Sequence, residues 1–416
     1  MSNAPQMPGP AVNEWWEDEH AMLRHTGDLL AAELSALRPG RPLPRPLPWH
    51  AGLQLQQDLG ADSLELMQLS SALAMALSPH DGGPLQQLHA LPTVGQWAAA
   101  ARDSLRRQSG KFGFATSGST GRARYCYHDA PLLWQEVAAL ARLLPGRRRI
   151  LCAVPAHHVY GFLFSILLPR ALGLSGVPVV DLRASAPAAL AGQLRSGDLV
   201  VAHPLYWSGV SDSGAALPGD VLGVSSGAPC PAQVAQALRA QSLATLMEVY
   251  GSSETAGVGW RTQEDAPYRC FPWWRAATDG AGGLLRTLPD GALRHHPAQD
   301  RLEWLGDDSF RPLGRVDHAV QVGGVNVFPA HVASVLTRHP GVRAACVRLM
   351  RPDEGTRLKA FVVPADASAD RPALAALLDA WSREVLSAAE RPVSLTLGES
   401  LPVGSNGKPR DWMISD

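Results

Sequence analysis

The sequence predicts an α/β protein with an all-helical segment before its main domain and a smaller α+β unit after it. Three observations support this organisation. Between residues 111 and 313, short apolar runs typical of buried strands alternate with stretches typical of helices. After residue 317, three more strand-like runs accompany two helical stretches. Before residue 110, helical patterns follow one another around a long proline-rich loop.

The main domain, expected over 111–314, should contain a largely parallel sheet. Its strand-like runs lie at 150–154, 177–180, 198–202, 220–224 and 246–250. The helical stretches at 131–144, 187–195 and 231–240 each open on a proline, which the first helical turn accepts. In the small unit, expected over 315–416, strands are predicted at 319–322, 344–350 and 358–363, and helices near 329–338 and 372–388.

The helical segment is expected over 14–107, after a flexible N-terminus at 1–13. An amphipathic helix is predicted over about 14–36, followed by the proline-rich loop at 38–51. A second helix should begin at Ser63, and a last one should follow Val94. This order of helix, long loop, helix and helix spans about ninety residues.

The composition excludes several functional classes. With 416 residues, 46% hydrophobic and 18% charged, the chain should form two or three domains of an ordinary soluble protein. A net charge of -1 forces no basic face, so no nucleic-acid partner is expected. The five cysteines form no Cys-x-x-Cys pair, which argues against a zinc site or a disulfide framework. Neither a signal peptide nor a membrane span is visible, so we expect a cytoplasmic protein without membrane insertion; the oligomeric state stays open.

The most informative motif is a loop of glycines and hydroxyl residues after the apolar stretch at 112–115. It reads Thr116, Ser117, Gly118, Ser119, Thr120, Gly121. Glycines let backbone N–H groups turn inward and the four hydroxyls add donors, so this loop can surround phosphate oxygens. It lacks the Gly-Lys-Ser/Thr of the P-loop. A run of this composition is also typical of a plain turn or linker, and three later segments favour the phosphate-binding interpretation.

These three segments carry charged groups suited to a nucleotide. Residues 249–255 pass from an apolar strand pattern into a turn that presents Glu254, and a carboxylate beside nucleotide phosphates suits Mg²⁺. Arg315 offers a rigid fork for ribose or phosphate oxygens, and Asp317 lies where the chain enters the small unit. Lys408 lies in a turn bounded by glycine and proline near the end of the sequence. Taken singly, each is also typical of a solvated side chain or a basic tail.

Together and in this order, the four motifs resemble those of the adenylate-forming superfamily. That superfamily includes acyl- and aryl-CoA synthetases, adenylation domains of peptide synthetases and fatty acyl-AMP ligases. Its phosphate loop is similar to 114–124, and its Tyr-Gly-x-Thr-Glu motif to 250–254, with Ser253 in place of Thr. Its Gly-Arg-x-Asp hinge matches 314–317, and its Gly-Lys turn matches 407–408. The resemblance covers about 110–416 and implies ATP and Mg²⁺ as cofactors and a small carboxylic acid as substrate.

The resemblance also implies a role for each matching residue. Lys408, Glu254 and His158 are the implied catalytic residues, Glu254 being the Mg²⁺ ligand and His158 part of the acyl pocket. Asp317 is the implied hinge of a mobile C-terminal domain. The implied ATP- and AMP-binding residues are Thr116, Ser117, Gly118, Ser119, Thr120, Gly121, Arg124, Gly227, Ala228, Tyr250, Gly251, Ser252, Ser253, Asp300 and Arg315. Two positions depart from the family: Arg124 replaces a lysine but keeps its charge, and Asp300 lacks the usual Thr-Gly before it.

The region before the phosphate loop is shorter than in an ordinary family member. Residues 59–66 resemble the attachment site of acyl carrier proteins, in which Ser63 would bear 4′-phosphopantetheine. A serine at a helix N-terminus suits a phosphodiester because of the helix dipole. However, Asp62 and Glu65 also fit the capping box of an ordinary helix. Glu65 is moreover the one acidic residue over 63–79, whereas carrier recognition helices are normally acidic.

The reaction implied is ATP-dependent activation of an aryl or acyl acid as acyl-AMP, followed by transfer to a phosphopantetheine thiol. The acceptor would be an acyl carrier protein in cis, on Ser63 after action of a phosphopantetheinyl transferase, or in trans. Residues 153–162 and 248–261 resemble AMP-ligases of aryl polyene and xanthomonadin pigment clusters, and 324–329 resembles phenylacetate-CoA ligases. Two alternatives stay open: a ligase that uses free CoA, and an adenylate-binding scaffold without catalysis. The sequence does not determine the acid.

Overall fold

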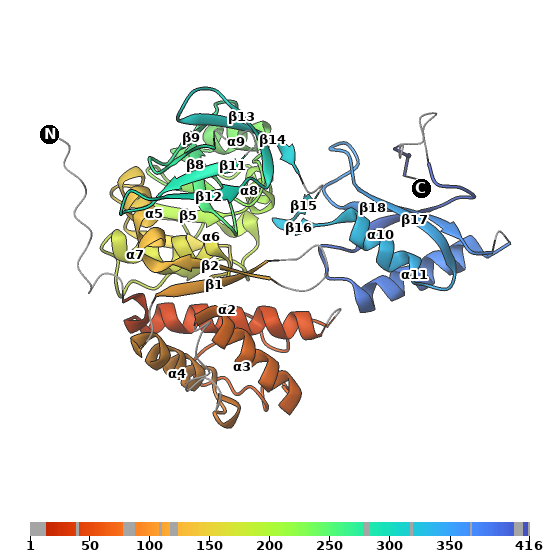
Figure 1. Cartoon of the computed structure of the whole chain (residues 1–416), viewed down its shortest axis with the longest axis horizontal. Helices are drawn as coiled ribbons and strands as arrows, with labels where there is room; N and C mark the ends of the chain where they lie inside the picture. Colours follow the sequence, from red (N-terminus) through yellow and green to blue (C-terminus); the bar gives the residue numbers. More distant parts are fainter. Residues whose placement is uncertain are drawn as a thin grey trace. The chain divides into compact units, whose positions relative to one another are not determined.

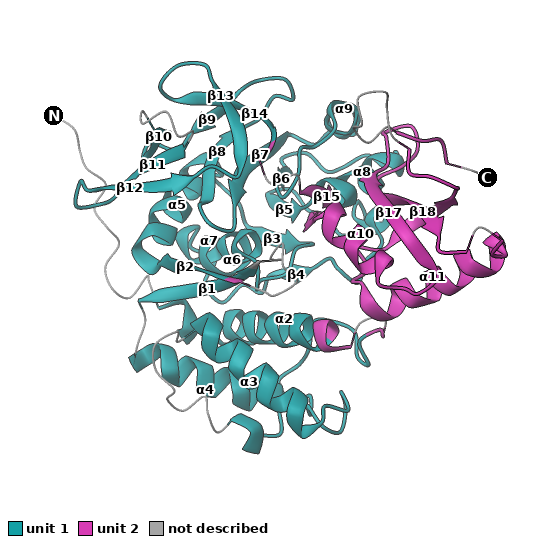
Figure 2. Ribbon diagram, turned by 45° about the vertical axis from the view of Figure 1, so that its right-hand side comes forward, with its two compact units in different colours: residues 1–34, 43–116, 125–314 teal, residues 35–42, 117–124, 315–416 magenta. Residues whose placement is uncertain are grey.

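The computed structural model describes residues 14–38, 41–77, 88–107, 110–116, 124–277, 283–316, 319–366, 368–402 and 411–414. The chain divides into two compact units (Figure 2). The first comprises residues 1–34, 43–116 and 125–314, and the second comprises residues 35–42, 117–124 and 315–416. The large and small parts expected of an adenylate-forming ligase are therefore both present.

Within the described residues, the first unit contains a nine-stranded sheet of order β13-β14-β9-β8-β7-β6-β5-β3-β4. Five neighbouring strands run parallel: β7 (Thr245–Ser252), β6 (Leu222–Ser225), β5 (Asp198–Ala202), β3 (Arg149–Cys152) and β4 (Val180–Asp181). The sheet continues through β8 (Ala256–Arg261), β9 (Tyr268–Cys270), β14 (Ser309–Arg315) and β13 (Asp300–Trp304), and β7, β8, β9 and β14 pair antiparallel in turn. The sequence predicted the parallel half, whereas the antiparallel half was not predicted.

Helices of the first unit connect these strands. The predicted ones are α5 (Ala130–Leu143) and α9 (Ala232–Ala240), while the stretch expected at 187–195 forms only the short 3₁₀ helix η4 (Pro187–Ala189). The sequence did not predict α8 (Pro204–Asp212), nor the helical run of α6 (Val159–Phe162), the π-helical η3 (Leu163–Leu167) and α7 (Leu168–Ala171). All five side chains of η3 are buried, and a helix that is buried on every side shows no amphipathic period to detect. A second antiparallel sheet consists of β10 (Trp274–Ala276), β11 (Gly283–Thr287) and β12 (Leu293–Pro297).

The N-terminal segment forms the three predicted helices, α2 (Glu19–Leu37), α3 (Ser63–Leu77) and α4 (Val94–Arg107). A short 3₁₀ helix, η1 (Trp15–Glu17), precedes α2 within the stretch predicted as one helix. They lie beside β1 (Lys111–Thr116) and β2 (Arg124–Asp129), as both views show (Figures 1 and 2). The sequence predicted a carrier-like domain over 14–107 distinct from a core over 111–314, yet the described residues of both stretches, except those at 35–42 and 124, belong to one compact unit. A carrier-like bundle is therefore not confirmed.

A shared aromatic core explains why these two stretches join. Trp15 of η1 is fully buried, and its ring centroid lies 5.8 Å from that of Phe112 in β1 and 5.1 Å from that of Phe162 in α6. The same apolar cluster continues through Trp97 of α4 to Phe310 of β14. Burying such large rings contributes strongly to stability, and here Trp15 packs directly on two rings of the other stretch.

The second unit is a small α+β structure, as predicted. Its main sheet has the order β17-β18-β19, in which β17 (Val342–Leu349) and β18 (Leu358–Pro364) are antiparallel and β19 (Pro392–Leu397) is parallel to β18. The unit also contains α10 (Pro329–Thr337), α11 (Arg371–Val385) and a hairpin of β15 (Val320–Val322) and β16 (Val325–Val327). Strands β16 and β19 were not predicted. Among the helices that the structure describes, none is long and apolar enough to cross a membrane.

Candidate active site

The predicted site residues of the first unit gather at one edge of its sheet. Because β3, β5, β6 and β7 are parallel neighbours, their C-terminal ends lie along the same edge. The segment 155–158 follows β3, Gly227 and Ala228 follow β6, and the motif that begins at Tyr250 ends β7. The topology thus brings together three motifs that are separated by up to a hundred residues in the sequence.

Hydrogen bonds join the strand ends at this edge. The Tyr160 hydroxyl lies 3.0 Å from the Ala202 carbonyl oxygen at the end of β5 and 3.2 Å from that of Val224 in β6. The Ser226 hydroxyl donates to the Val249 carbonyl of β7 at 2.7 Å. Burial raises the pKa of Tyr160 well above its ordinary value, so this phenol stays neutral. The Tyr160 hydroxyl thus bridges the ends of β5 and β6.

His158 follows β3 at this edge. Its side chain is exposed to water, yet enough protein surrounds the ring for burial to lower its pKa to about 4. The neighbouring ring of His157 lies 4.2 Å away, centroid to centroid, and burial lowers its pKa well below the ordinary value too. Both imidazoles are therefore neutral near pH 7. His158 can contact a substrate and form hydrogen bonds, but it does not act as a protonated general acid.

Glu254 stands on a tight turn between β7 and β8. The Ser252 hydroxyl accepts hydrogen bonds from the backbone N–H groups of Glu254, at 3.2 Å, and of Thr255, at 3.3 Å. A Cβ on Gly251 would lie only 2.1 Å from the Ala256 carbonyl oxygen, so the turn requires glycine there. Among the described residues, the Glu254 carboxylate has no hydrogen bond or ion pair, which leaves its oxygens free for a cation.

Two buried residues that the sequence analysis missed support this turn. His128 of β2 contacts the Ser253 carbonyl oxygen through Nε2 at 2.6 Å, and burial lowers the pKa of its imidazole, so the neutral ring donates this hydrogen bond. Both carboxyl oxygens of Glu136 in α5 accept from the Gly257 backbone N–H at 3.0 Å. A detectable signal existed for Glu136, which is a charged residue within the apolar stripe of an amphipathic helix.

Asp300 and Tyr250, both predicted to bind the nucleotide, are brought into contact. The Tyr250 hydroxyl donates to Asp300 Oδ2 at 2.6 Å, although fifty residues separate them. Arg315 ends β14 and is half-buried, directly after the boundary between the two units. Arg124 begins β2 and is exposed, and Thr116 ends β1. Ser117, Gly118, Ser119, Thr120, Gly121, Asp317 and Lys408 lie outside the described residues.

Ser63 lies on a different part of the first unit, at the start of α3. Its side chain is exposed, and the neighbouring Leu64 and Met67 are exposed as well. The Asp62 backbone N–H donates to Glu65 Oε2 at 3.0 Å, and the Glu65 N–H donates to Asp62 Oδ1 at 2.8 Å. This is the reciprocal capping box that the sequence allowed as an alternative.

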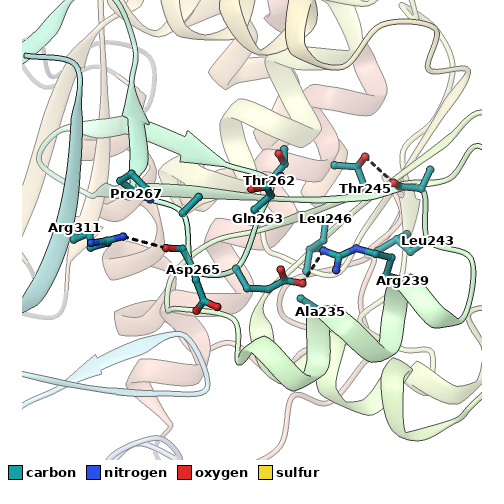
Figure 3. A pocket seen from close by; sticks show the side chains of 13 residues that line it. Ala235, Arg239, Leu243, Thr245, Leu246, Thr262, Gln263, Asp265, Pro267 and Arg311 are labelled. Carbon is teal, nitrogen blue, oxygen red and sulfur yellow. Dashed lines mark hydrogen bonds and ion pairs between the residues drawn. The ribbon is translucent and has the colours of Figure 1, made fainter. Parts of the chain in front are cut away.

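A cavity of about 730 Å³ lies at the opposite end of β7 from these motifs (Figure 3). Thr245 and Leu246, at the start of β7, line it together with Arg239, Glu264 and Arg311. Arg239 forms an ion pair with Glu264 at 2.7 Å, and Arg311 donates to the Asp265 carbonyl at 3.4 Å. Arg239 and Glu264 thus compensate each other's charge, and none of the predicted site residues lines the cavity.

Comparison with known proteins decides the family. Residues 112–280 match the family described as AMP-binding enzyme, and residues 331–408 match the AMP-binding enzyme C-terminal domain. A protein of Halorhodospira halophila named 4-coumarate–CoA ligase is 38% identical over 352 residues, which are 85% of this chain and 88% of that protein. The chain belongs to the AMP-binding enzyme family. It is an AMP-forming acid–thiol ligase.

Further relatives agree with this assignment. The 4-coumarate–CoA ligase of Rhodobacter capsulatus is 39% identical over 368 residues, covering 86% of this chain and 91% of that protein. Among solved structures, the amide bond synthetase McbA of Marinactinospora thermotolerans aligns with a TM-score of 0.59 at 22% identity, over 93% of this chain and 92% of that one. A malonyl-CoA ligase complex with methylmalonyl-CoA and AMP aligns with a TM-score of 0.55, also at 22% identity, over 70% of this chain and 71% of that one. At this identity, the structural similarity establishes the fold alone.

Proposed function

We propose that the protein activates an aryl or acyl carboxylic acid with ATP and transfers the acyl group to the thiol of free CoA. The observation that carries this proposal is the extent of similarity to relatives named 4-coumarate–CoA ligase. Residues 111–416 are 306 of 416 residues, whereas the alignments cover 85% and 86% of the chain. The similarity therefore extends into the N-terminal helices, which favours a CoA ligase with integral helices over a ligase fused to a carrier.

The first step is adenylation. The substrate carboxylate attacks the α-phosphorus of ATP, the bond to the β-phosphate oxygen breaks, and pyrophosphate leaves. Loop 116–121 is proposed to hold the β- and γ-phosphates, and Lys408 to stabilise charge between the carboxylate and the α-phosphate. Glu254 fits a Mg²⁺ ligand, because its unpaired carboxylate stands on a rigid turn; the ion would supply charge neutralisation to the phosphates. Tyr250 and Asp300, joined by their hydrogen bond, would bind the nucleoside.

The second step is thioester formation. The CoA thiol loses its proton and its sulfur attacks the acyl carbon, the bond to the phosphate oxygen breaks, and AMP leaves. As the family resemblance implies, the second unit would rotate about Asp317 and carry Lys408 away between the steps. Neutral His158, at the strand-end edge, would line the acyl group.

Incubation with ATP, Mg²⁺, CoA and a panel of acids tests the proposal. 4-Coumarate is the first acid to try because the relatives bear its name, followed by phenylacetate and polyene acids of the pigment-cluster type. Acyl-CoA should form with stoichiometric AMP. Lys408→Ala should abolish pyrophosphate release yet largely spare acyl-CoA formation from pre-made acyl-AMP. Acyl-AMP without acyl-CoA would reject CoA as acceptor, and no pyrophosphate release with any acid would indicate a non-catalytic scaffold.

A second candidate is transfer to phosphopantetheine on Ser63. It is favoured by one observation, namely that the Ser63 side chain and the adjacent Leu64 and Met67 are accessible to a modifying enzyme. Co-expression with a broad phosphopantetheinyl transferase and intact-mass measurement tests it. One added phosphopantetheine that Ser63→Ala removes would support this candidate, and an unchanged mass would reject it.

A further inference from the structure

Helix α2 places a buried carboxylate against the segment that carries His157 and His158. Asp28 of α2 is 3% exposed, and its Oδ2 accepts a hydrogen bond from the Ala156 backbone N–H at 2.7 Å. This segment follows β3 at the strand-end edge described above, and 128 residues separate the two partners in the sequence. A charge-assisted hydrogen bond in a dry environment fixes geometry more firmly than a neutral one.

A network of ion pairs holds Asp28 in place. Its Oδ1 lies 2.7 Å from Nη2 of Arg183, and Arg183 also pairs with Asp181 at the end of β4. Arg24, one turn before Asp28 in α2, contacts Asp181 at 3.4 Å and the Ser165 hydroxyl at 3.3 Å. The two carboxylates and the two guanidinium groups of this network thus compensate one another's charge between α2 and the core, as buried charges require.

The segment behind this hydrogen bond has little freedom to adjust. A Cβ on Gly161 would lie 2.0 Å from the Pro155 carbonyl oxygen, so the turn from β3 into α6 is closed tightly upon itself. On its inner side, Phe162 packs against the rings of Trp15 and His25, at centroid distances of 5.1 Å and 5.5 Å. The N-terminal helices therefore contact this segment through both a hydrogen bond and ring packing.

We infer that Asp28 is a positioning residue for acid binding, which acts through Ala156 to hold the segment that bears His157 and His158 beside the acyl group. The N-terminal helix would then be part of the acid site rather than an attached module. This inference rests on the proposed function, because it takes the strand-end edge at His158 to be the place where the acid binds.

Steady-state pyrophosphate release, with the best acid found for the wild type, tests the inference. Asp28→Ala should raise KM for the acid about tenfold or more, the factor expected for one lost charge-assisted hydrogen bond, and leave KM for ATP nearly unchanged. Asp28→Asn retains an acceptor for the Ala156 N–H and should restore most of the affinity. Arg24→Met is the matched control, since it removes a charge from the same network without touching residues 155–158.

A second variant covers the case in which Asp28→Ala does not fold. Asp28→Ala combined with Arg183→Met removes an acid and a base together, which avoids an uncompensated buried cation and should give the same rise in KM. An unchanged KM for the acid in an active variant, or an equal rise in Arg24→Met, would overturn the inference. If the wild type activates no acid, the proposed function fails, and hydrogen exchange then tests the positioning role of Asp28. The Ala156 amide should lose its protection from exchange in the variant. Unchanged protection of this amide would overturn the inference.

Discussion

Glu136 should make the stability of the first unit depend on pH in an unusual direction. Its side chain is fully buried in α5, and both oxygens accept from the Gly257 N–H at 3.0 Å. Burial raises the pKa of this carboxyl from 4.5 to about 7, although Arg286 and the Gly257 hydrogen bond oppose the rise. The folded protein therefore binds a proton at Glu136 that the unfolded chain has already released above pH 4.5.

The difference between the folded and unfolded pKa of Glu136 sets the sign and size of its contribution to stability. Because the folded-state pKa is the higher one, the stabilising contribution is present below pH 4.5 and is lost as the pH rises through about 7. A pKa difference of 1 corresponds to about 1.4 kcal/mol. The titration of Glu136 should therefore lower the free energy of unfolding of the first unit by about 2.5 kcal/mol between about pH 5 and pH 8. Most buried carboxylates that are paired with bases act in the opposite direction.

Urea unfolding of the wild type and Glu136→Gln at several pH values measures this term. Ten of the twelve tryptophans lie in the first unit, so tryptophan fluorescence follows its transition. Glutamine keeps an acceptor for the Gly257 N–H but does not titrate. The contributions of all other titrating groups to the free energy of unfolding cancel in the difference between the two proteins. Relative to the wild type, the variant should gain about 2.5 kcal/mol from about pH 5 to pH 8. A difference that is constant with pH would refute the reasoning.

Three further predictions concern the site. His128→Ala removes the donor to the Ser253 carbonyl beside Glu254, so the Mg²⁺ concentration for half-maximal pyrophosphate release should rise about tenfold; a Mg²⁺ titration checks this. Gly161→Ala forces a Cβ to 2.0 Å from a carbonyl oxygen and should destabilise the first unit by at least about 2 kcal/mol, measured by urea unfolding. Lys359→Met removes the buried amine that pairs with Asp411 at 3.0 Å, and Asp411 lies three residues beyond Lys408. The rate of adenylation should fall by about 10- to 100-fold, while thioester formation from pre-made acyl-AMP should persist in a half-reaction assay.

Much of the fold could be predicted because local patterns specify it. The run at 198–202 is entirely buried and forms β5 with the predicted bounds, and the predicted helix at 329–338 corresponds to α10. The antiparallel half of the large sheet was missed because its strands carry exposed polar residues and form no continuous apolar run, as at β9 and β13. Apolar period alone also did not separate a strand from a buried helix over 159–171.

The site was only partly accessible from the sequence. Motifs at strand ends could be located, since the topology of a parallel sheet gathers them at one edge. The contacts that support them could not, because they join residues far apart in the chain. His128 and Ser253 are separated by 125 positions, and Asp28 and Ala156 by 128. The packing of the N-terminal helices on the residues after 110 could not be predicted for the same reason, since no local pattern shows that Trp15 packs on Phe162.

The packing of the N-terminal helices bears directly on the choice of acyl acceptor. A carrier domain delivers its thiol by moving as a body, but moving α2 would break the buried pair between Asp28 and Arg183, and removing one partner of such a pair typically costs about 3–5 kcal/mol. Helix α3, which bears Ser63, is packed closely on β1: a Cβ on Gly113 would lie 2.8 Å from the Met75 carbonyl oxygen. Movement of these helices as a body would therefore disrupt buried contacts of the core. A diffusible thiol such as CoA needs no such movement, which supports the proposal of CoA rather than Ser63 as the acceptor.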